Sequence, residues 1–391
     1  MPIWPLLATL AVQTLATMSL YSLPALAPAV AHDLGVNGAL VGGFVATAYG
    51  VGIVSALLSP ALIRRYGGVR ATQAVLLAAL GMQTIAGTAH GVAALAISAV
   101  VLGLAYGAAA PASTHLLAPK TPAAIFNTIM SFRQIGVPLG GVLAALVLPP
   151  LVGHLGGRGA LLAETVPVAV LIGLMEIPRK QWDAELDRTR YRLAQTLVRP
   201  FALLADKRIR RLSLGTFIFS GLQLCFVSFM TVQLTTVARM DLVSAGRILA
   251  LYQIAGSVSR PIWGWIADRF MTPSQTLALH GAGMAAAAAL TGQFGAAWPL
   301  WGVIAVALLA GCTAGGYTGV AYAEYAHLGG SRRTEATGLG TALMFSGGML
   351  MPTAFAATIA ANGEYGMAYG AAAILALIGA VSLGIRAKSQ P

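Results

Sequence analysis

The segment Ser257–Phe270, S-V-S-R-P-I-W-G-W-I-A-D-R-F, places an arginine inside a long apolar stretch. Arg260 precedes Asp268 by eight residues, which is about 12 Å along an α-helix. If Asp268 marks the polar end of a membrane helix, Arg260 lies near the bilayer centre, where a charge must face a cavity, a partner or a bound molecule. A guanidinium there can donate two parallel hydrogen bonds to a carboxylate. The alternative is a structural arginine paired to backbone carbonyls or to a neighbouring acid.

A second arginine, Arg133, lies about eleven residues into another predicted helix, or about 16 Å from the start of that helix. Its neighbour Gln134 adds an amide. On the helix of Arg260, Gln253 and Ser257 lie seven and three residues earlier, on roughly the same face. These residues predict a polar site built around two guanidiniums. The alternative for Arg133 is a role in packing or topology, nearer the end of its helix.

Three further candidates for binding come from the aromatic and amide side chains of the predicted helices. Tyr21, Gln223 and Tyr317 are favoured by their depth. A tyrosine hydroxyl or a glutamine amide can orient a carboxylate, and an aromatic ring can pack on a carbon skeleton. The alternative for each is packing between helices.

Few ionisable side chains lie inside the predicted helices. Glu164 and His280 are candidates for carrying a proton, and Glu324 is a candidate gate residue; the alternatives are an interfacial acid, a packing histidine and a helix-end ion pair. Glu164 and Glu324 each lie nearer a helix end than its middle. No acid is therefore expected at the membrane centre to neutralise Arg133 and Arg260, which favours an anionic ligand over a lipophilic cation.

The composition indicates a polytopic membrane protein. The 391 residues are 57% hydrophobic and only 9% charged, far below the charged fraction of soluble domains. The two cysteines, Cys225 and Cys312, cannot form a disulfide framework, and no ligand spacing for a metal and no catalytic cluster is present. The net charge of +12 is concentrated in loops, not on a basic face interleaved with aromatics. We therefore expect no cofactor, no metal, no nucleic-acid partner and no enzymatic activity.

Apolar stretches long enough to cross a bilayer recur along the chain. They predict twelve helices, at 4–31, 38–60, 70–88, 92–116, 122–150, 159–177, 212–237, 246–267, 273–292, 298–325, 335–359 and 366–386. A basic polar loop at 178–211 separates the sixth helix from the seventh and is expected to contain a short interfacial helix. The sequence thus predicts an all-α integral membrane protein.

The distribution of Lys and Arg predicts the orientation. Nineteen of the 24 lie in the termini and the even-numbered loops, three lie in or beside odd-numbered loops, and two lie inside helices. Because cytoplasmic loops are enriched in Lys and Arg, we expect a multi-pass protein of the cell inner membrane with both termini and the 178–211 loop in the cytoplasm.

Two turns of the chain have related sequences, Pro60–Tyr66 after the second helix and Gly264–Phe270 after the eighth. This repetition indicates two pseudo-symmetric bundles of six helices, at 1–177 and 212–391. On these turns the chain resembles the major facilitator superfamily over essentially its whole length. The signature of that family, G-x-x-x-D-R-x-G-R, is matched by Gly264, Asp268 and Arg269; the N-terminal copy keeps Arg65 and Gly67 and has Pro60 and Arg64 in place of the glycine and the aspartate.

Two more segments carry the resemblance. Gly136–Gly141, G-V-P-L-G-G, is similar to a glycine-proline motif in the fifth helix of the family, and S-R-P-I-W-G resembles the eighth helix of monocarboxylate and oxalate:formate carriers. In those carriers the arginine of R-P-x-x-G contacts the substrate carboxylate, a role that falls here on Arg260. The resemblance also implies that the fifth and eighth helices lie near each other, so that Arg133 and Arg260 converge.

The resemblance implies a secondary transporter that moves a small mono- or dicarboxylate by alternating access. Gating is expected from Asp268, Arg269, Gly264, Arg65 and Glu324. A proton or an exchanged anion is the expected coupling partner, and we expect a monomer in a lipid bilayer. The main alternative is a proton-coupled exporter of drugs or other amphiphiles, which should have a buried carboxylate in its cavity; a non-transporting sensor should carry an added soluble domain.

Overall fold

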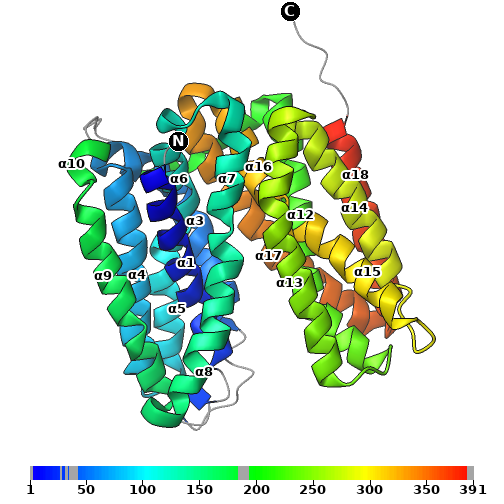
Figure 1. The fold of residues 1–391 in the computed structure, drawn as a ribbon. Coiled ribbons are helices and arrows are strands. Elements are labelled where there is room, and N and C mark those ends of the chain that lie inside the picture. The colour runs from blue at the N-terminus through cyan, green and yellow to red at the C-terminus, as the bar shows by residue number, and fades with distance from the viewer. Residues whose placement is uncertain (1–2, 27–28, 31–33, 35–42, 184–192, 385–391) are drawn as a thin grey trace, which may run out of the picture. The chain divides into compact units, whose positions relative to one another are not determined.

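A computed structural model describes residues 3–26, 29–30, 34, 43–183 and 193–384. Within these ranges the chain forms helices and no strands (Figure 1). The helices divide into two compact units. Unit 1 comprises Met1–Pro122, Arg133–Ala202 and Gly329–Ala342, and unit 2 comprises Ala123–Phe132, Leu203–Leu328 and Leu343–Pro391.

Unit 1 contains most helices of the first half of the chain: α1 (Ile3–Ala25), α3 (Gly43–Tyr66), α4 (Gly68–Gly87), α5 (Val92–Tyr106), α6 (Ala109–Leu117), α8 (Gly136–Ala163), α9 (Thr165–Glu176), α10 (Arg179–Trp182) and α11 (Leu193–Val198). Helix α1 packs on α8 and α4, and α4 also packs on α5 and α9. The described parts of the predicted 178–211 loop contain α10, α11 and a 3-10 segment at Arg199–Ala205; residues 184–192 lie outside the described ranges.

Unit 2 contains α12 (Lys207–Thr236), α13 (Leu242–Arg269), α14 (Pro273–Thr291), α15 (Leu300–Ala310), α16 (Thr318–Gly329) and α18 (Tyr365–Gly384). A π-helical turn, Gly311–Gly315, links α15 to α16 and packs on α13. Helix α7 (Phe126–Gln134) begins in unit 2 and ends in unit 1, and α17 (Arg333–Asn362) begins in unit 1 and ends in unit 2; the last residue of α16, Gly329, also falls in unit 1. The predicted boundaries at 177 and 212 therefore do not coincide with the limits of the units.

Eight described segments are long and apolar enough to cross a membrane. Two of them, Ala123–Glu176 and Leu300–Asn362, are 54 and 63 residues long, roughly twice or more what one crossing needs. Helices α13 and α14 lie outside these eight and are 28 and 19 residues long. Counted in this way, the helices of the described ranges supply the twelve predicted crossings.

Three predicted helices are interrupted. The helix at 92–116 breaks near Gly107 into α5 and α6, and the helix at 298–325 contains the π-helical turn. The helix at 122–150 is divided at Ile135 into α7 and α8. Beyond that range, Gly156 of α8 leaves helical geometry (φ 70°, ψ 171°). Because a positive φ is easily reached only by glycine, Gly156 marks the end of the fifth crossing and the start of the sixth.

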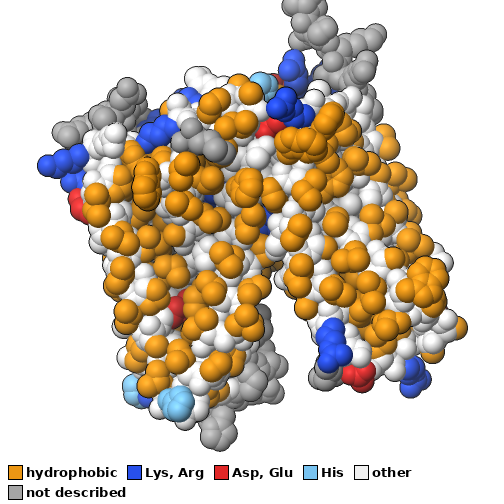
Figure 2. Space-filling model, viewed as in Figure 1, with side chains coloured by type: hydrophobic (Ala, Val, Ile, Leu, Met, Phe, Trp, Pro, Cys, Tyr) orange, Lys and Arg blue, Asp and Glu red, His pale blue; other side chains and the backbone are white. Residues whose placement is uncertain are grey.

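The surfaces of both units suit a bilayer. Large apolar side chains such as Leu104, Leu146 and Val166 are more than 60% exposed on α5, α8 and α9. Figure 2 shows apolar side chains over the visible faces of the units, with Lys and Arg gathered toward their ends. Exposed apolar area of this extent on a water-soluble protein would promote aggregation, whereas a bilayer covers it.

Candidate functional site

Arg133 lies at the end of α7 and is only 1% exposed. Its guanidinium donates from Nη2 to Gln13 Oε1 at 2.6 Å and to the Ala109 carbonyl at 3.0 Å, and from Nη1 to Gln134 Oε1. These acceptors come from α1, α6 and α7. Three elements therefore fix the orientation of one buried guanidinium, and the binding role predicted for Arg133 and Gln134 stays a prediction.

A chain of polar contacts leads from Arg133 to an aromatic pair. Gln13 Nε2 donates to Thr17 Oγ1 at 2.9 Å, and Thr17 Oγ1 lies 3.3 Å from the Tyr106 hydroxyl. The Tyr106 ring stacks on Tyr49, with a centroid separation of 6.3 Å and an interplanar angle of 29°. Unit 1 thus links a guanidinium to two aromatic rings through hydroxyl and amide groups.

The glycine-proline segment explains why Gln13 reaches Arg133. A Cβ on Gly140 would lie 2.3 Å from the Thr14 carbonyl, and a Cβ on Gly136 would lie 2.9 Å from the Leu10 carbonyl. Helix α8 therefore approaches the backbone of α1 more closely than any side chain would allow. Tyr21, on the same helix α1, is half-buried and faces Gly141.

Arg260 is 3% exposed and lies in the second half of α13. Its Nε donates to the Gly315 carbonyl at 2.8 Å, at the end of the π-helical turn. Gly256 and Gly315 allow this contact, because a Cβ on Gly315 would lie 2.7 Å from Gly256 Cα. Arg260 is thus oriented by an irregular turn of unit 2, and π-helical turns of this kind often occur at functional sites.

The same turn accepts two further hydrogen bonds from α13. Ser259 Oγ and Trp263 Nε1 donate to the Cys312 carbonyl at 3.2 Å and 2.8 Å. Neither residue is predicted from the sequence, because a backbone carbonyl presented by a π-helical turn has no signature in side-chain types. The predicted neighbours of Arg260, Ser257 and Gln253, are half-buried, and Ser257 Oγ donates to the Gln253 carbonyl at 2.8 Å.

The other predicted binding residues of unit 2 lie in different surroundings. Tyr317 is fully buried and packs edge-on against Phe219, with ring centroids 5.7 Å apart. Gln223 is half-buried, and its carbonyl lies 3.5 Å from the Tyr252 hydroxyl. Tyr317 therefore has the surroundings of a core residue. Arg133 belongs to unit 1 and Arg260 to unit 2, so their predicted convergence on one site stays a prediction.

The predicted proton and gate candidates His280, Glu164 and Glu324 are all buried. His280 is 0% exposed, its Nδ1 lies 2.8 Å from the Thr276 carbonyl, and its ring packs on Trp263 at 4.4 Å. Glu164 is 2% exposed and contacts Ser19 of α1. Glu324 is 6% exposed and accepts from Ser274 Oγ at 2.8 Å.

Asp268, near the end of α13, accepts four hydrogen bonds from the first turn of α7. The donors are the backbone N and Nδ2 of Asn127, at 3.1 and 2.8 Å, and the backbone N and Oγ1 of Thr128, at 2.9 and 2.6 Å. A Cβ on Gly264 would lie 2.7 Å from the Asn127 carbonyl, so the signature glycine permits this approach. Arg269 is exposed. A carboxylate at a helix N-terminus satisfies orphan amides and the helix dipole.

The corresponding turn of unit 1 uses different residues. Arg64, in the last turn of α3, pairs with Glu335 at 2.7 Å, and Glu335 lies in the first turn of α17. Arg332 donates to the same carboxylate at 2.7 Å, and Arg199 lies 3.6 Å from it. Glu335 itself is 1% exposed. Arg65, a predicted gate residue, is exposed and lies over the Tyr66 ring at 5.3 Å.

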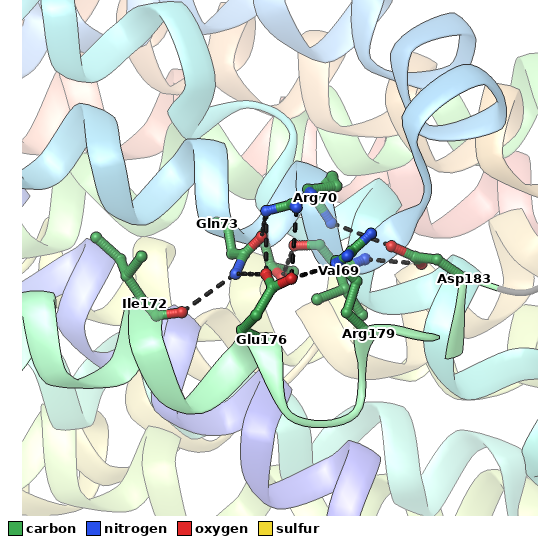
Figure 3. Close-up of polar contacts among 8 residues, drawn as sticks. Val69, Arg70, Gln73, Ile172, Glu176, Arg179 and Asp183 are labelled. Carbon is green, nitrogen blue, oxygen red and sulfur yellow. Dashed lines mark hydrogen bonds and ion pairs between the residues drawn. The ribbon is translucent and has the colours of Figure 1, made fainter. Parts of the chain in front are cut away.

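A second carboxylate, that of Asp183 at the end of α10, contacts the start of α4. Asp183 accepts from the backbone N of Val69 at 3.0 Å and of Arg70 at 3.3 Å, and so caps α4 (Figure 3). Gly67 makes room for it, since a Cβ there would lie 2.1 Å from Asp183 Cγ. Beside it, Glu176 accepts from Gln73 at 3.1 Å and pairs with Arg70 at 3.0 Å.

Comparisons with known proteins concern most of the chain for the family and 47–63% of it for two curated relatives. The family described as Major Facilitator Superfamily matches residues 9–352. The chain is 28% identical over 279 residues to the 4-hydroxybenzoate transporter PcaK of Pseudomonas aeruginosa, covering 63% of this chain and 61% of that protein. It is 29% identical over 219 residues to the gallate transporter of Pseudomonas putida, covering 47% of each. The chain thus spans about half to three fifths of the length of these curated relatives.

Solved structures match over nearly the full length. The human organic anion transporter MFSD10 (TETRAN) has a TM-score of 0.77 at 17% identity, covering 97% of this chain and 98% of that chain. The E. coli fucose:proton symporter FucP has a TM-score of 0.77 at 13% identity, covering 98% and 99%. At these identities the likeness concerns the fold, and it confirms the predicted all-α membrane architecture of two six-helix bundles.

Proposed function

The chain belongs to the Major Facilitator Superfamily, and from that premise we propose that it transports a small organic carboxylate across a membrane by alternating access. It acts as a carrier and not as an enzyme. Among carboxylates we favour an aromatic one, because the two curated relatives carry the names of a 4-hydroxybenzoate transporter and a gallate transporter.

The observation that carries the proposal is the burial and fixed orientation of the two predicted arginines. Arg133 and Arg260 are 1% and 3% exposed in helices with apolar surfaces. Burial of a guanidinium is unfavourable without specific hydrogen bonds, and here Gln13, Gln134 and backbone carbonyls supply them. A planar, permanently charged group held in this way is suited to bidentate recognition of a carboxylate.

Unit 1 also suits the ring of an aromatic carboxylate. The stacked Tyr49 and Tyr106 rings are joined to Arg133 through Gln13 and Thr17. Aromatic faces and edges pack favourably on another ring, and tyrosine and threonine hydroxyls can bond a ring hydroxyl. In the proposed site Arg133 and Arg260 bind the carboxylate, and five further residues orient the rest of the substrate: Gln134, Tyr21, Gln223, Gln253 and Ser257.

Asp268 and Glu335 are the proposed gate contacts. Each carboxylate lies at the first turn of a helix, α7 or α17, and the contact it makes lies within one unit. Loss of either contact would release that first turn, so we propose that these contacts stabilise one state of the transport cycle. On the distribution of Lys and Arg we propose that they lie on the cytoplasmic side of the inner membrane.

A thermal-shift panel tests the substrate class. Purified protein is unfolded with 4-hydroxybenzoate, gallate, short aliphatic mono- and dicarboxylates, and lipophilic cations; a ligand that binds only the native state raises its stability. We expect aromatic carboxylates to raise the unfolding temperature, and Arg260→Gln to weaken their apparent affinity by about 10- to 100-fold, since hydrogen bonds to charged groups contribute about 1.5–3 kcal/mol.

Arg158→Gln is the matched control, because Arg158 also donates to a backbone carbonyl, that of Ala89, at 2.9 Å. It should leave the ligand response unchanged. Shifts from lipophilic cations with none from any carboxylate would overturn the proposal in favour of the exporter alternative.

A further inference from the structure

We propose that Glu164 is the proton-binding site of this protein, and that its carboxyl group is held as a neutral acid in this conformation. The proposal deepens the transport function by naming its coupling ion and the residue that carries it. The importance of Glu164 for transport rests on the proposed function, whereas its protonation state does not.

Glu164 joins α8 to α9 deep within the sixth crossing. It follows the break at Gly156 by eight residues and precedes Glu176, the last residue of α9, by twelve. These separations correspond to about 12 Å and about 18 Å along a helix. The sequence alone places Glu164 nearer a helix end, because the predicted sixth helix starts at 159 and omits the residues that follow Gly156. At 2% exposure, Glu164 is a buried ionisable group at membrane depth, a kind of residue that is rare without a function.

The contacts of Glu164 come from α1 and α4. Ser19 Oγ lies 3.2 Å from Glu164 Oε1, and Gln83 Nε2 donates to Ser19 Oγ at 2.7 Å. Ser19 Oγ also lies 2.9 Å from the Leu15 carbonyl. In the described part of the chain, Glu164 Oε2 and Gln83 Oε1 are buried and have no hydrogen-bond partner.

Counting hydrogens favours a proton on Glu164. A serine hydroxyl has one hydrogen, so Ser19 cannot donate fully to both the Leu15 carbonyl and Glu164, and the Leu15 contact is shorter. The nearby Ser22 hydroxyl uses its hydrogen on the Ser19 carbonyl at 2.9 Å. Ser22 and Gln83 also lie beside Glu164, but in the described contacts only the Ser19 hydroxyl is within hydrogen-bond distance of its carboxyl group. An ionised Glu164 would therefore be a buried anion with weak compensation, which is a costly arrangement. A proton on Glu164 removes the charge and supplies the missing donor.

The helices around Glu164 bring it no compensating cation in the described contacts. The titratable side chains on α1, α4, α8 and α9 are Tyr21, Arg70, His154, Arg158 and Glu176. Arg70 pairs with Glu176, Arg158 donates to the Ala89 carbonyl, and His154 is exposed. Tyr21 faces Gly141 of α8. The surroundings thus stabilise the neutral acid, and loss of the proton would favour a conformation in which water reaches the carboxylate.

Helix α1 contacts both Glu164 and Arg133, the arginine of unit 1 that we propose to bind the substrate. Ser19, which contacts Glu164, and Gln13, which contacts Arg133, lie six residues apart on α1, about 9 Å along the helix. A proton taken up on one side of the membrane joins the carboxylate of Glu164 to form a carboxylic acid, and is released as a proton on the other side. Movement of α1 that accompanies either step would reach Arg133 through Gln13.

Infrared spectroscopy of the purified protein tests the protonation state directly. The carbonyl band of a protonated carboxylic acid is separate from the bands of a carboxylate. At neutral pH we expect such a band in wild-type protein, its loss in Glu164→Gln and its displacement in Glu164→Asp. Glu176→Gln, which removes an exposed acid from the same helix, should leave the band unchanged. Should Glu164→Gln fold poorly, the Asp variant still decides. Absence of the band, or a band that neither Glu164 variant alters, would overturn the proposal.

Transport in proteoliposomes tests the coupling. With 4-hydroxybenzoate as the probe, an imposed pH gradient should drive accumulation by wild type and by Glu176→Gln. Glu164→Gln should lose this accumulation and the accompanying proton movement, while substrate exchange, which needs no net proton movement, continues. Accumulation by Glu164→Gln equal to wild type would refute a role in coupling. If wild type moves no carboxylate, the proposed function fails and the infrared result still decides the state of Glu164.

Discussion

The α3–α4 turn of unit 1 and the α13–α14 turn of unit 2 have related sequences but hold their helix ends with opposite charges. In the α13–α14 turn the acid lies on the turn itself, and Asp268 accepts from the first turn of α7. In the α3–α4 turn the turn residue is Arg64, and the acid, Glu335, lies in the first turn of α17. In both units a carboxylate therefore lies at the N-terminus of a helix, where the dipole favours it.

This difference shows how a degenerate signature can keep its physical effect. With Arg64 in place of the aspartate, the α3–α4 turn has no anion of its own at this position. Glu335, in the first turn of α17, supplies the negative charge instead. The two turns also differ in the cap of the helix that follows. Helix α14 is capped locally by Thr272 and Gln275 in a capping box, whereas α4 depends on Asp183, 114 residues from Val69.

The largest expected effect is the loss of Glu335. Glu335→Ala leaves Arg64 and Arg332 facing each other across a buried position, and removal of one partner from a buried ion pair costs about 3 kcal/mol. The measurement is thermal or denaturant unfolding in detergent. Glu176→Ala is the matched control, because Glu176 pairs with two arginines but its side chain is 46% exposed; its effect should be small. An equal loss of stability in Glu335→Ala and Glu176→Ala would show that burial of the carboxylate does not determine how much its ion pairs contribute.

Exchange of the two charges of the Arg64–Glu335 pair tests whether the location of the negative charge matters. Arg64→Glu combined with Glu335→Arg should recover only about 1 kcal/mol of the loss in the single variants. Full recovery is not expected, because the exchanged guanidinium would lie at the N-terminus of α17 beside Arg332. Unfolding of the double variant at the wild-type temperature would show that the location of the negative charge is irrelevant.

The next effect concerns Asp268. Asp268→Asn turns one acceptor oxygen into a donor, which in either orientation of the amide faces the backbone N–H of Asn127 or of Thr128, and should cost about 2 kcal/mol. Asp206→Asn is the control, because Asp206 caps α12 by a single contact with Arg208 N and asparagine caps as well as aspartate. An equal loss of stability in Asp268→Asn and Asp206→Asn would show that the four-donor contact of Asp268 contributes no more than an ordinary helix cap.

The smallest effect concerns the glycine of the α3–α4 turn. Gly67→Ala adds a Cβ close to Asp183 at a φ of 97°, which should destabilise the protein by about 1–2 kcal/mol. Gly91→Ala should be neutral or slightly stabilising, because Gly91 has a φ of 176° and open space around its Cβ position. A neutral Gly67→Ala would indicate that Asp183 does not cap α4 closely in solution.

Much of the fold could be predicted from the sequence, because apolar length and the positions of charges report directly on membrane crossings. The burial of Arg133 agrees with its depth in the predicted helix, whereas its contact with Gln134 could not be predicted from adjacency, because neighbouring residues of a helix do not face each other. The Arg64–Glu335 pair could not be predicted either, since its members are 271 residues apart and each is individually an ordinary loop or helix-end charge. The carbonyl partner of Arg260 depends on a π-helical turn, which leaves no side-chain pattern.

Uptake of 4-hydroxybenzoate into proteoliposomes by Arg133→Lys and Arg260→Lys tests the central claim most directly. Lysine keeps the charge and loses the planar pair of donors, so uptake by both variants should fall at least about tenfold, while Arg158→Lys transports like wild type. Wild-type uptake that both lysine variants retain in full would contradict a carboxylate site built on these two guanidiniums.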